Sequence, residues 1–311
     1  MTLARTFSEA LRDRRIQKLL TAAGLPGHYI DDLAEHVVPL AAALCRQARD
    51  RASPLLVGLN GCQGSGKSTL AEFLSLMLQI GARVHCPVLS IDDFYLKKSV
   101  RRRLARDVHP LLVTRGAPGT HDLTLADKTL TALLDRSRPE PARVPGFDKA
   151  TDERLHPEHW RAIAPGVDVV VLEGWCVGCP PQPAAALREP VNELERNEDT
   201  DGKWRSYVNE QLEKDYRIFF ERLDLLVMLK APGFECVYEW RREQERQLQA
   251  SLGEASESAS QILDGPALRR FIDHFERLTR HQLATLPAKA DAVVELSAAH
   301  RMVGHSGCLY P

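Results

Sequence analysis

The fold of this chain is decided by residues 54–68, which read PLLVGLNGCQGSGKS. The run from Pro54 to Leu59 is short and apolar, as expected of a buried strand, and the last eight letters match G-x-x-x-x-G-K-S/T. A helical stretch, residues 68–79, follows and stops at Gly81. A strand, a glycine-rich turn and a helix in this order predict a phosphate-binding loop, because backbone N–H groups at the helix N-terminus surround phosphates. The alternative, a fortuitous glycine-rich turn, is disfavoured by these flanks.

The side chains of this loop predict its ligands. Lys67 can reach the β- and γ-phosphates of a nucleotide, and the Ser68 hydroxyl can bind Mg²⁺. The chain contains no N-K-x-D motif for reading guanine, so we expect ATP and Mg²⁺ as cofactors. The residues expected to contact the nucleotide are Gly61, Cys62, Gln63, Gly64, Ser65, Gly66, Lys67, Ser68 and Thr69.

Length and charge exclude several classes of protein. The 311 residues fit about two domains or one enlarged α/β domain. Lys and Arg number 41 against 42 Asp and Glu, and this balance argues against a nucleic-acid partner, which needs a basic excess. No apolar run approaches the roughly 20 residues that span a bilayer, and residues 1–20 lack the apolar core of a secretory signal. Seven scattered cysteines predict a reducing, cytoplasmic location.

Short apolar runs alternate with helical patterns along the rest of the chain. Further apolar runs cover residues 88–91, 167–172, 223–229 and 292–296, and helical patterns cover 122–135, 205–222, 234–250 and 266–284. Nearly continuous apolar strands separated by helices imply a parallel sheet covered on both faces. We therefore predict an α/β fold of the P-loop type, with three layers (α/β/α) around a mainly parallel five-stranded sheet.

The remaining segments complete the predicted organisation. Residues 1–53 carry apolar residues at spacings of three and four, which predicts an N-terminal helical extension to a domain over 54–311. Residues 185–204 are charged and contain Pro and Gly, so we expect an insertion that crosses the surface. Residues 251–265 are small and polar, which is typical of a mobile loop.

Acidic residues stand at the ends of two predicted strands. Asp92 and Asp93 follow the second strand, and Glu173 ends the third. Carboxyl ends of parallel strands form the ligand-binding edge of an open α/β sheet. There Asp92 could accept a proton from a substrate hydroxyl during phosphoryl transfer, and Glu173 could hold Mg²⁺ directly or through water. The alternatives are a cap for the next segment at Asp92-Asp93 and an ordinary turn acid at Glu173.

A set of motifs then makes the prediction narrower. The segments GCQGSGKST, SIDDFYL, RGAPGTHD, PGFDKATDER, VVVLEGW and EWRREQE occur in this order from about residue 54 to the end of the chain. Together they resemble the D-glycerate 3-kinase family, which comprises plant-type glycerate kinases and fungal and bacterial kinase-like relatives. That family resembles the wider phosphoribulokinase, uridine kinase and pantothenate kinase group.

The resemblance implies an ATP-dependent kinase that transfers the γ-phosphoryl group to a hydroxyl of a small molecule, with D-glycerate as the leading acceptor. Pantothenate, a nucleoside or a sugar phosphate is the alternative acceptor. Two other classes stay open: a P-loop ATPase or regulator without a small acceptor, and a non-catalytic nucleotide-binding protein. The sequence does not predict an oligomeric state.

The resemblance also implies roles for individual residues. It makes Lys67 and Asp92 catalytic, with Asp92 as the base, and it assigns Mg²⁺ to Ser68 and Glu173. The segments SIDDFYL, RGAPGTHD and PGFDKATDER, here called the acceptor-side segments, carry the candidate substrate-binding residues Asp92, Tyr95, Arg115, His121, Lys149 and Arg154. For Lys149 and Arg154, a solvated surface pair is the alternative.

A lid over the transferring phosphate is implied at about residues 234–250, where the candidate arginines are Arg241, Arg242 and Arg246. Arg242 and Arg246 share one helix face and are the predicted catalytic pair. The alternative is a helix in which neighbouring glutamates neutralise these arginines. Near the C-terminus, His300 and Arg301 stand where related kinases place the adenine-binding loop. Cys176 and Cys179 form a lone CxxC, which we interpret as two incidental thiols.

Overall fold

The computed structural model describes residues 2–49, 51–252 and 265–310. The loop predicted over residues 251–265 falls largely on residues 253–264, outside the described residues. No helix in the described ranges is both long and apolar enough to cross a membrane.

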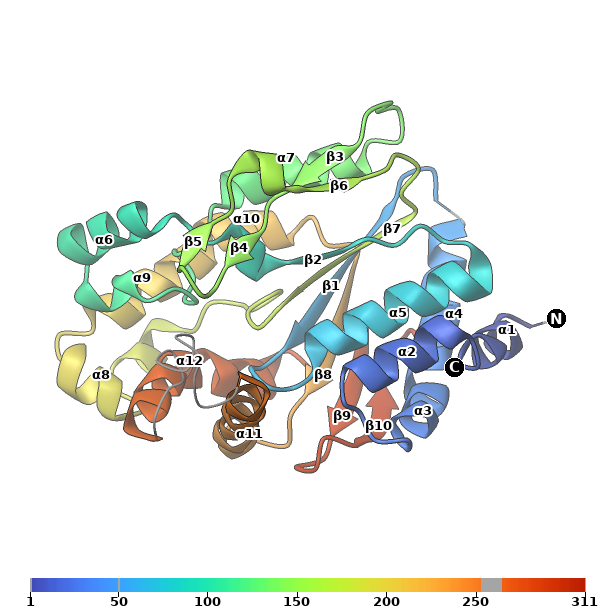
Figure 1. The fold of residues 1–311 in the computed structure, drawn as a ribbon. Coiled ribbons are helices and arrows are strands. Elements are labelled where there is room, and N and C mark those ends of the chain that lie inside the picture. The colour runs from blue at the N-terminus through green and yellow to red at the C-terminus, as the bar shows by residue number, and fades with distance from the viewer. Residues whose placement is uncertain (1, 50, 253–264, 311) are drawn as a thin grey trace.

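The predicted parallel sheet forms the centre of the molecule (Figure 1). Its strand order is β10-β9-β8-β1-β7-β2, and the five strands from β9 to β2 run parallel. The α/β prediction is therefore confirmed. The strands are β1 (Leu55–Gly61), β2 (Val88–Ser90), β7 (Val169–Gly174), β8 (Leu225–Lys230), β9 (Ala292–Leu296) and β10 (Met302–Ser306).

The predicted number of five strands is wrong, because the described part of the sheet has a sixth, antiparallel edge strand, β10. Its sequence, MVGHS, contains a glycine and two polar residues, and Val303 is 60% exposed. The strand also carries an irregular register between Met302 and Gly304. An exposed edge strand needs no continuous apolar run, so the signal used for the buried strands does not find it.

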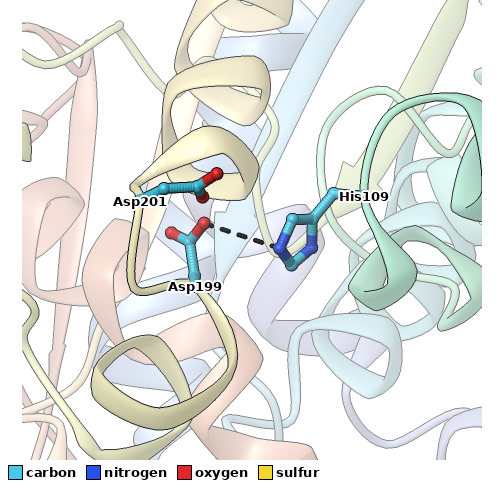
Figure 2. A group of neighbouring side chains, drawn as sticks. All are labelled: His109, Asp199 and Asp201. Atoms are coloured by element: carbon cyan, nitrogen blue, oxygen red, sulfur yellow. Dashed lines mark ion pairs between the residues drawn. The ribbon is translucent and has the colours of Figure 1, made fainter.

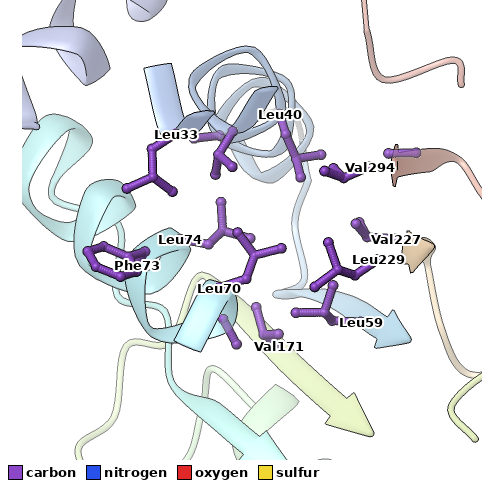
Figure 3. Packing of buried hydrophobic residues seen from close by; sticks show 14 of the residues in the cluster. Leu33, Leu40, Leu59, Leu70, Phe73, Leu74, Val171, Val227, Leu229 and Val294 are labelled. Carbon is purple, nitrogen blue, oxygen red and sulfur yellow. The ribbon is translucent and has the colours of Figure 1, made fainter. Parts of the chain in front are cut away.

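Helices cover the sheet on both faces, as side-chain alternation along the strands requires. In β1, Leu55, Val57 and Leu59 contribute to one hydrophobic cluster, while Leu56 contributes to a second. Figure 3 shows the first cluster, in which Leu33 and Leu40 of the N-terminal helices face the sheet together with residues of α5. The elements of this side are α1 (Leu3–Ala10), α2 (Arg14–Ala22), α3 (Tyr29–Asp32), η1 (Leu33–Val37), α4 (Val38–Arg49) and α5 (Lys67–Ala82).

The second cluster packs the opposite face of the sheet. Residues of α11 and α12 contribute to the first cluster, and α12 also contributes to the second. In chain order, the helical elements after α5 are η2 (Ile91–Phe94), α6 (Lys98–Asp107), η3 (Pro110–Val113), α7 (Leu123–Leu134), η4 (Pro157–His159), η5 (Ala184–Leu187), α8 (Glu193–Glu198), α9 (Lys203–Gln211), η6 (Leu212–Tyr216), α10 (Arg217–Phe220), α11 (Glu235–Leu252) and α12 (Gly265–Thr285). Two small antiparallel pairs, β3 (Ala142–Val144) with β6 (Arg161–Ile163) and β4 (Phe147–Asp148) with β5 (Glu153–Arg154), complete the fold.

Most residues of the segment 185–204 are exposed, as expected of a surface segment, but two of its acidic side chains are buried. Glu195 and Asp199 have side chains that are 0% exposed. Glu195 pairs with Arg277 of α12 at 2.6 Å, and Asp199 pairs with Arg205 at 2.9 Å. Because each buried carboxylate has an arginine partner, charge alone did not indicate exposure here.

Candidate active site

A cavity of about 290 Å³ opens at the carboxyl edge of the sheet, beside the phosphate-binding loop. It contains both the loop and the acceptor-side segments, although these are far apart in the sequence. The predicted residues that line it are Gln63, Gly64, Gly66, Lys67, Ser68, Thr69, Asp92, Tyr95, Arg115 and Lys149. Three predicted loop residues, Gly61, Cys62 and Ser65, are buried beneath the loop instead.

The loop has the backbone that its glycines predict. Gly64 and Gly66 have φ angles of 78° and 83°, a region that favours glycine. A Cβ atom at Gly64 would lie 2.7 Å from Cβ of Trp240 in α11, so this helix packs directly on the loop. Burial raises the pKa of Cys62 to about 12, which makes its thiol unreactive.

Ser68 and Glu173 meet where the loop approaches the end of β7. The Ser68 hydroxyl donates a hydrogen bond of 2.9 Å to Oε1 of Glu173. The other carboxylate oxygen, Oε2, is buried and has no hydrogen-bond partner among the residues that the structure describes. A hydroxyl beside an unpartnered carboxylate oxygen fits Mg²⁺, which prefers oxygen ligands.

Asp92 lies in η2, immediately after β2, and both of its carboxylate oxygens have partners. Oδ1 accepts a hydrogen bond of 2.7 Å from the Tyr95 hydroxyl, and Oδ2 accepts one of 2.9 Å from Lys149 Nζ. Burial by itself would raise the pKa of Asp92, but the charges of Lys149 and Lys67 outweigh it and hold this pKa well below its ordinary value. Asp92 is therefore a negatively charged carboxylate in the cavity.

Arg115 and Lys149 place positive charge on the acceptor side of the cavity. Arg115 Nη1 donates to Asp152 Oδ1 at 2.6 Å, and its guanidinium lies 5.6 Å from the centre of the Phe147 ring. Lys149 is 62% exposed in its side chain and reaches Asp92 from the turn between β4 and β5. A paired guanidinium and an exposed ammonium in the cavity of Asp92 suit an acceptor that carries an anionic group.

Two predicted acceptor residues lie outside the cavity wall. Arg154 donates to Asp122 Oδ2 at 3.1 Å and to the Tyr95 carbonyl at 2.8 Å, so its guanidinium holds β5 against these two residues. His121 is 5% exposed, and its ring stacks on that of Tyr95 with 4.7 Å between centroids. Asp122 also caps α7 by accepting a hydrogen bond of 3.0 Å from Leu125 N–H.

The predicted pair of lid arginines lies outside the cavity wall. Arg242 and Arg246 are exposed and pair with Glu239 and Glu243 on the outer face of α11. Arg241 lines the cavity instead. A sequence signal for it exists, since Phe234, Val237 and Trp240 form an apolar stripe in the core and Arg241 stands four residues after Val237.

Three aromatic residues of the cavity wall were also missed. Trp175 follows β7, and Phe271 and Phe275 stand one turn apart on α12. Their spacing predicts only a core-facing helix, because aromatic residues at i and i+4 are ordinary in a helix that packs on a sheet.

The structure places His300 and Arg301, near the C-terminus, in different surroundings. His300 Nε2 lies 2.8 Å from the Gly64 carbonyl oxygen, and its ring lies 4.1 Å from that of Trp240. Arg301 binds Asp32 of α3 at 2.6 Å, so it joins the N-terminal helices to the sheet. Of these two residues, the contacts connect His300 with the phosphate-binding loop.

Within the described ranges, one other cluster has the composition of a metal site: His109, Asp199 and Asp201 (Figure 2). His109 Nδ1 accepts from Leu111 N–H, so a neutral ring carries its proton on the nitrogen that faces Asp199. Asp199 already binds the Arg205 guanidinium and two backbone N–H groups. These contacts make the cluster an anchor for the start of α9.

No protein-family model matches the chain. A relative called uncharacterized kinase mug58, from Schizosaccharomyces pombe, is 32% identical over 253 residues, which cover 78% of this chain and 86% of the relative. The chloroplastic D-glycerate 3-kinase of Arabidopsis thaliana is 29% identical over 223 residues, covering 69% and 46% respectively. The solved structure of a D-glycerate 3-kinase from Cryptococcus neoformans superposes with a TM-score of 0.69 at 23% identity, over 86% of this chain and 96% of the other.

The chain has a three-layer α/β fold with a phosphate-binding loop, and Lys67 of that loop shares one cavity with Asp92. This combination defines the class of P-loop kinases. The similarities are consistent with this class, because the relatives are kinases. The chain belongs to the family that contains the D-glycerate 3-kinases and their kinase-like relatives. The predicted resemblance and the predicted enzyme class, an ATP-dependent phosphotransferase with a hydroxyl acceptor, are confirmed.

Proposed function

We propose that this kinase transfers the γ-phosphoryl group of ATP to a hydroxyl of D-glycerate. The observation that carries the proposal is the shared cavity, in which Lys67 of the phosphate-binding loop, the charged Asp92 and the cation Arg115 lie together. The names of the Arabidopsis and Cryptococcus relatives support glycerate in particular. A cavity of about 290 Å³ also suits a small acceptor.

The nucleotide side of the proposed mechanism rests on the loop. Lys67 and the backbone N–H groups of the loop would bind the β- and γ-phosphates. Ser68 and Glu173 would hold Mg²⁺, which neutralises phosphate charge when bound. Thr69 lines the cavity one residue further along α5.

The acceptor side rests on Asp92 and the nearby cations. Arg115 and Lys149 would bind the acceptor carboxylate, and Asp92 would orient the hydroxyl and take its proton. Oδ2 of Asp92 becomes available for that proton when Lys149 moves from it to the acceptor. Tyr95 would stay on Oδ1 throughout.

We further propose that α11, which covers the predicted lid at 234–250, closes over the phosphates with Arg241 as its arginine in place of Arg242 and Arg246. Residues 54–311 would form the kinase domain, with 185–204 as an insertion and 1–53 as an N-terminal extension. All seven cysteines are free thiols, which supports a cytoplasmic location.

The test is a coupled assay of ADP release from MgATP across an acceptor panel of D-glycerate, L-glycerate, pantothenate, uridine and ribulose 5-phosphate. We expect D-glycerate to stimulate ADP release most strongly. Greatest stimulation by another acceptor would replace glycerate with that acceptor. Equal ADP release with every acceptor and with none would indicate an ATPase without a small acceptor.

A further inference from the structure

Tyr216 lies directly behind the acceptor side of the cavity, although it comes from a distant part of the chain. It ends η6, a π-helical turn between α9 and α10, and it is 1% exposed. Its hydroxyl accepts a hydrogen bond of 3.0 Å from Gly119 N–H and lies 2.6 Å from His121 Nδ1. Both partners belong to the acceptor loop, residues 115–122.

The proton positions in this contact follow from counting donors. Gly119 N–H uses the Tyr216 oxygen as an acceptor, and no other acceptor for the phenolic proton is recorded among the described residues. Nε2 of His121 is also buried without a partner among the described residues. A proton on Nδ1 would leave both the phenolic proton and Nε2 unpaired, so the arrangement with fewer unpaired groups has the Tyr216 O–H donating to Nδ1 and the proton of the neutral imidazole on Nε2. Burial lowers the pKa of His121 to about 4, so the ring is uncharged near neutral pH.

The His121 ring transmits this fixed position to Tyr95. The two rings stack at 4.7 Å between centroids with 25° between their planes, and the two residues also form a backbone bridge. Tyr95 is 4% exposed, and its hydroxyl donates to Asp92 Oδ1 at 2.7 Å. A continuous contact chain thus runs from Tyr216 through His121 and Tyr95 to Asp92.

Two further contacts hold the acceptor loop, residues 115–122, in place. Gly119 has a φ angle of 95°, and a Cβ atom there would lie 2.6 Å from the Tyr207 ring. Trp175 Nε1 donates to the Gly116 carbonyl at 3.0 Å. Tyr95 is therefore fixed, whereas Lys149, the other partner of Asp92, has a side chain that is 62% exposed.

We propose that Tyr216 is a positioning residue that orients Asp92 through His121 and Tyr95. By keeping Tyr95 on Oδ1, this chain of contacts directs Oδ2 toward the acceptor hydroxyl. Oδ2 then takes the hydroxyl proton as the acceptor oxygen bonds to the γ-phosphorus and the bond from that phosphorus to the leaving ADP oxygen breaks. The inference rests on the proposed role of Asp92, but not on glycerate as the acceptor.

A double-mutant cycle with Tyr216→Phe and Tyr95→Phe tests this, using whichever acceptor of the panel gives the highest turnover. We expect Tyr216→Phe to lower kcat roughly 10-fold, a part of the 10²–10⁴-fold that a positioned base contributes, with the KM for ATP unchanged. The double variant should turn over no more slowly than Tyr95→Phe alone, because both changes act through one contact chain. Tyr310→Phe is the matched control, because it also removes a hydrogen-bonded phenol hydroxyl, but one that donates to the His36 carbonyl outside the site; it should match the wild type.

Two results would overturn the role of Tyr216: wild-type kcat in Tyr216→Phe, or rate losses of the two substitutions that multiply in the double variant. A second readout does not depend on turnover. In ¹⁵N NMR of histidine-labelled protein, His121 should carry its proton on Nε2 in the wild type and lose that preference in Tyr216→Phe. A proton on Nδ1 in the wild type contradicts the proposal. Failure of D-glycerate alone, with another acceptor active, would overturn only the proposed acceptor.

Discussion

Lys149 Nζ lies 2.9 Å from Oδ2 of Asp92, on the oxygen opposite the Tyr95 hydroxyl. The charge of Asp92 raises the pKa of Lys149, so the pair is ionised on both sides. Asp92 thus keeps its negative charge in the cavity while paired with a cation whose side chain is 62% exposed. In the proposed mechanism, the acceptor would bind where this contact is broken, and Lys149 would then bind the acceptor's own carboxylate.

Lys149→Met should raise the KM for the acceptor by roughly 10-fold or more, since a hydrogen bond to a charged group contributes about 1.5–3 kcal/mol. The KM for ATP should change little. Without Lys149, burial raises the pKa of Asp92, so the loss of kcat/KM in acid should move to higher pH. Steady-state kinetics over a pH series measure both effects. Lys214→Met, which removes an exposed surface lysine, is the control. An unchanged acceptor KM in Lys149→Met would exclude this role.

Replacing Glu173 by Gln should weaken the dependence on Mg²⁺. The substitution removes the negative charge of a buried carboxylate that accepts from Ser68 on Oε1 and whose Oε2 has no hydrogen-bond partner among the described residues. We expect the Mg²⁺ concentration for half-maximal activity to rise by at least roughly 10-fold, the lower end of what even an indirect ligand contributes. The measurement is a Mg²⁺ titration at fixed ATP, with the exposed Glu158→Gln as control. An unchanged titration would leave Glu173 as an ordinary buried acid.

The lid arginines offer a comparison within one helix. Arg241→Ala should lower kcat by roughly 10²-fold or more, because a donor aimed at transition-state charge is worth about that much. Arg242→Ala and Arg246→Ala should stay near wild type, since exposed pairs with Glu239 and Glu243 contribute little. Turnover numbers of the three variants decide the matter. A large loss in Arg242→Ala or Arg246→Ala, with Arg241→Ala active, would restore the predicted pair.

Stability should fall on acidification because of two buried histidines. Burial lowers the pKa of both His121 and His274 to about 4. The unfolded chain takes up these protons near pH 6.5, and the folded protein does so only near pH 4, so stability is full above about pH 6.5 and is lost as the pH falls. Urea unfolding from about pH 7 to about pH 5 should show this fall.

His121→Gln and His274→Gln should each reduce the slope of that fall, up to about one proton apiece. Constant stability across this pH range, or slopes that neither substitution alters, would contradict the buried, neutral state of the two rings.

The sequence predicts those parts of the molecule that depend on local patterns. Buried strands such as β1 require continuous apolar runs, and the phosphate-binding loop requires closely spaced glycines. Both patterns can be recognised directly in the sequence. The edge strand β10 is not visible, because a half-exposed strand needs neither pattern. The buried Glu195–Arg277 pair is hidden for a related reason, since its partners are far apart in sequence.

The same distinction applies to the site. Asp92 follows β2 and Glu173 lies at the carboxyl end of β7. Parallel strands bring their carboxyl ends together, so the proximity of these two residues is predictable. Which arginine of α11 faces the cavity depends on how that helix packs on Gly64, and this is a tertiary fact. Tyr216 reaches Asp92 only through two other side chains, and no local pattern encodes that path.

The most direct test of the central claim follows the γ-phosphate itself, in wild type and in Asp92→Asn. With γ-labelled ATP and D-glycerate, the wild type should place the label in a glycerate phosphoester, one for each ADP formed. Asp92→Asn should bind ATP with nearly unchanged affinity and form no labelled ester. Label that appears only as inorganic phosphate, at one rate with and without D-glycerate, would contradict the account.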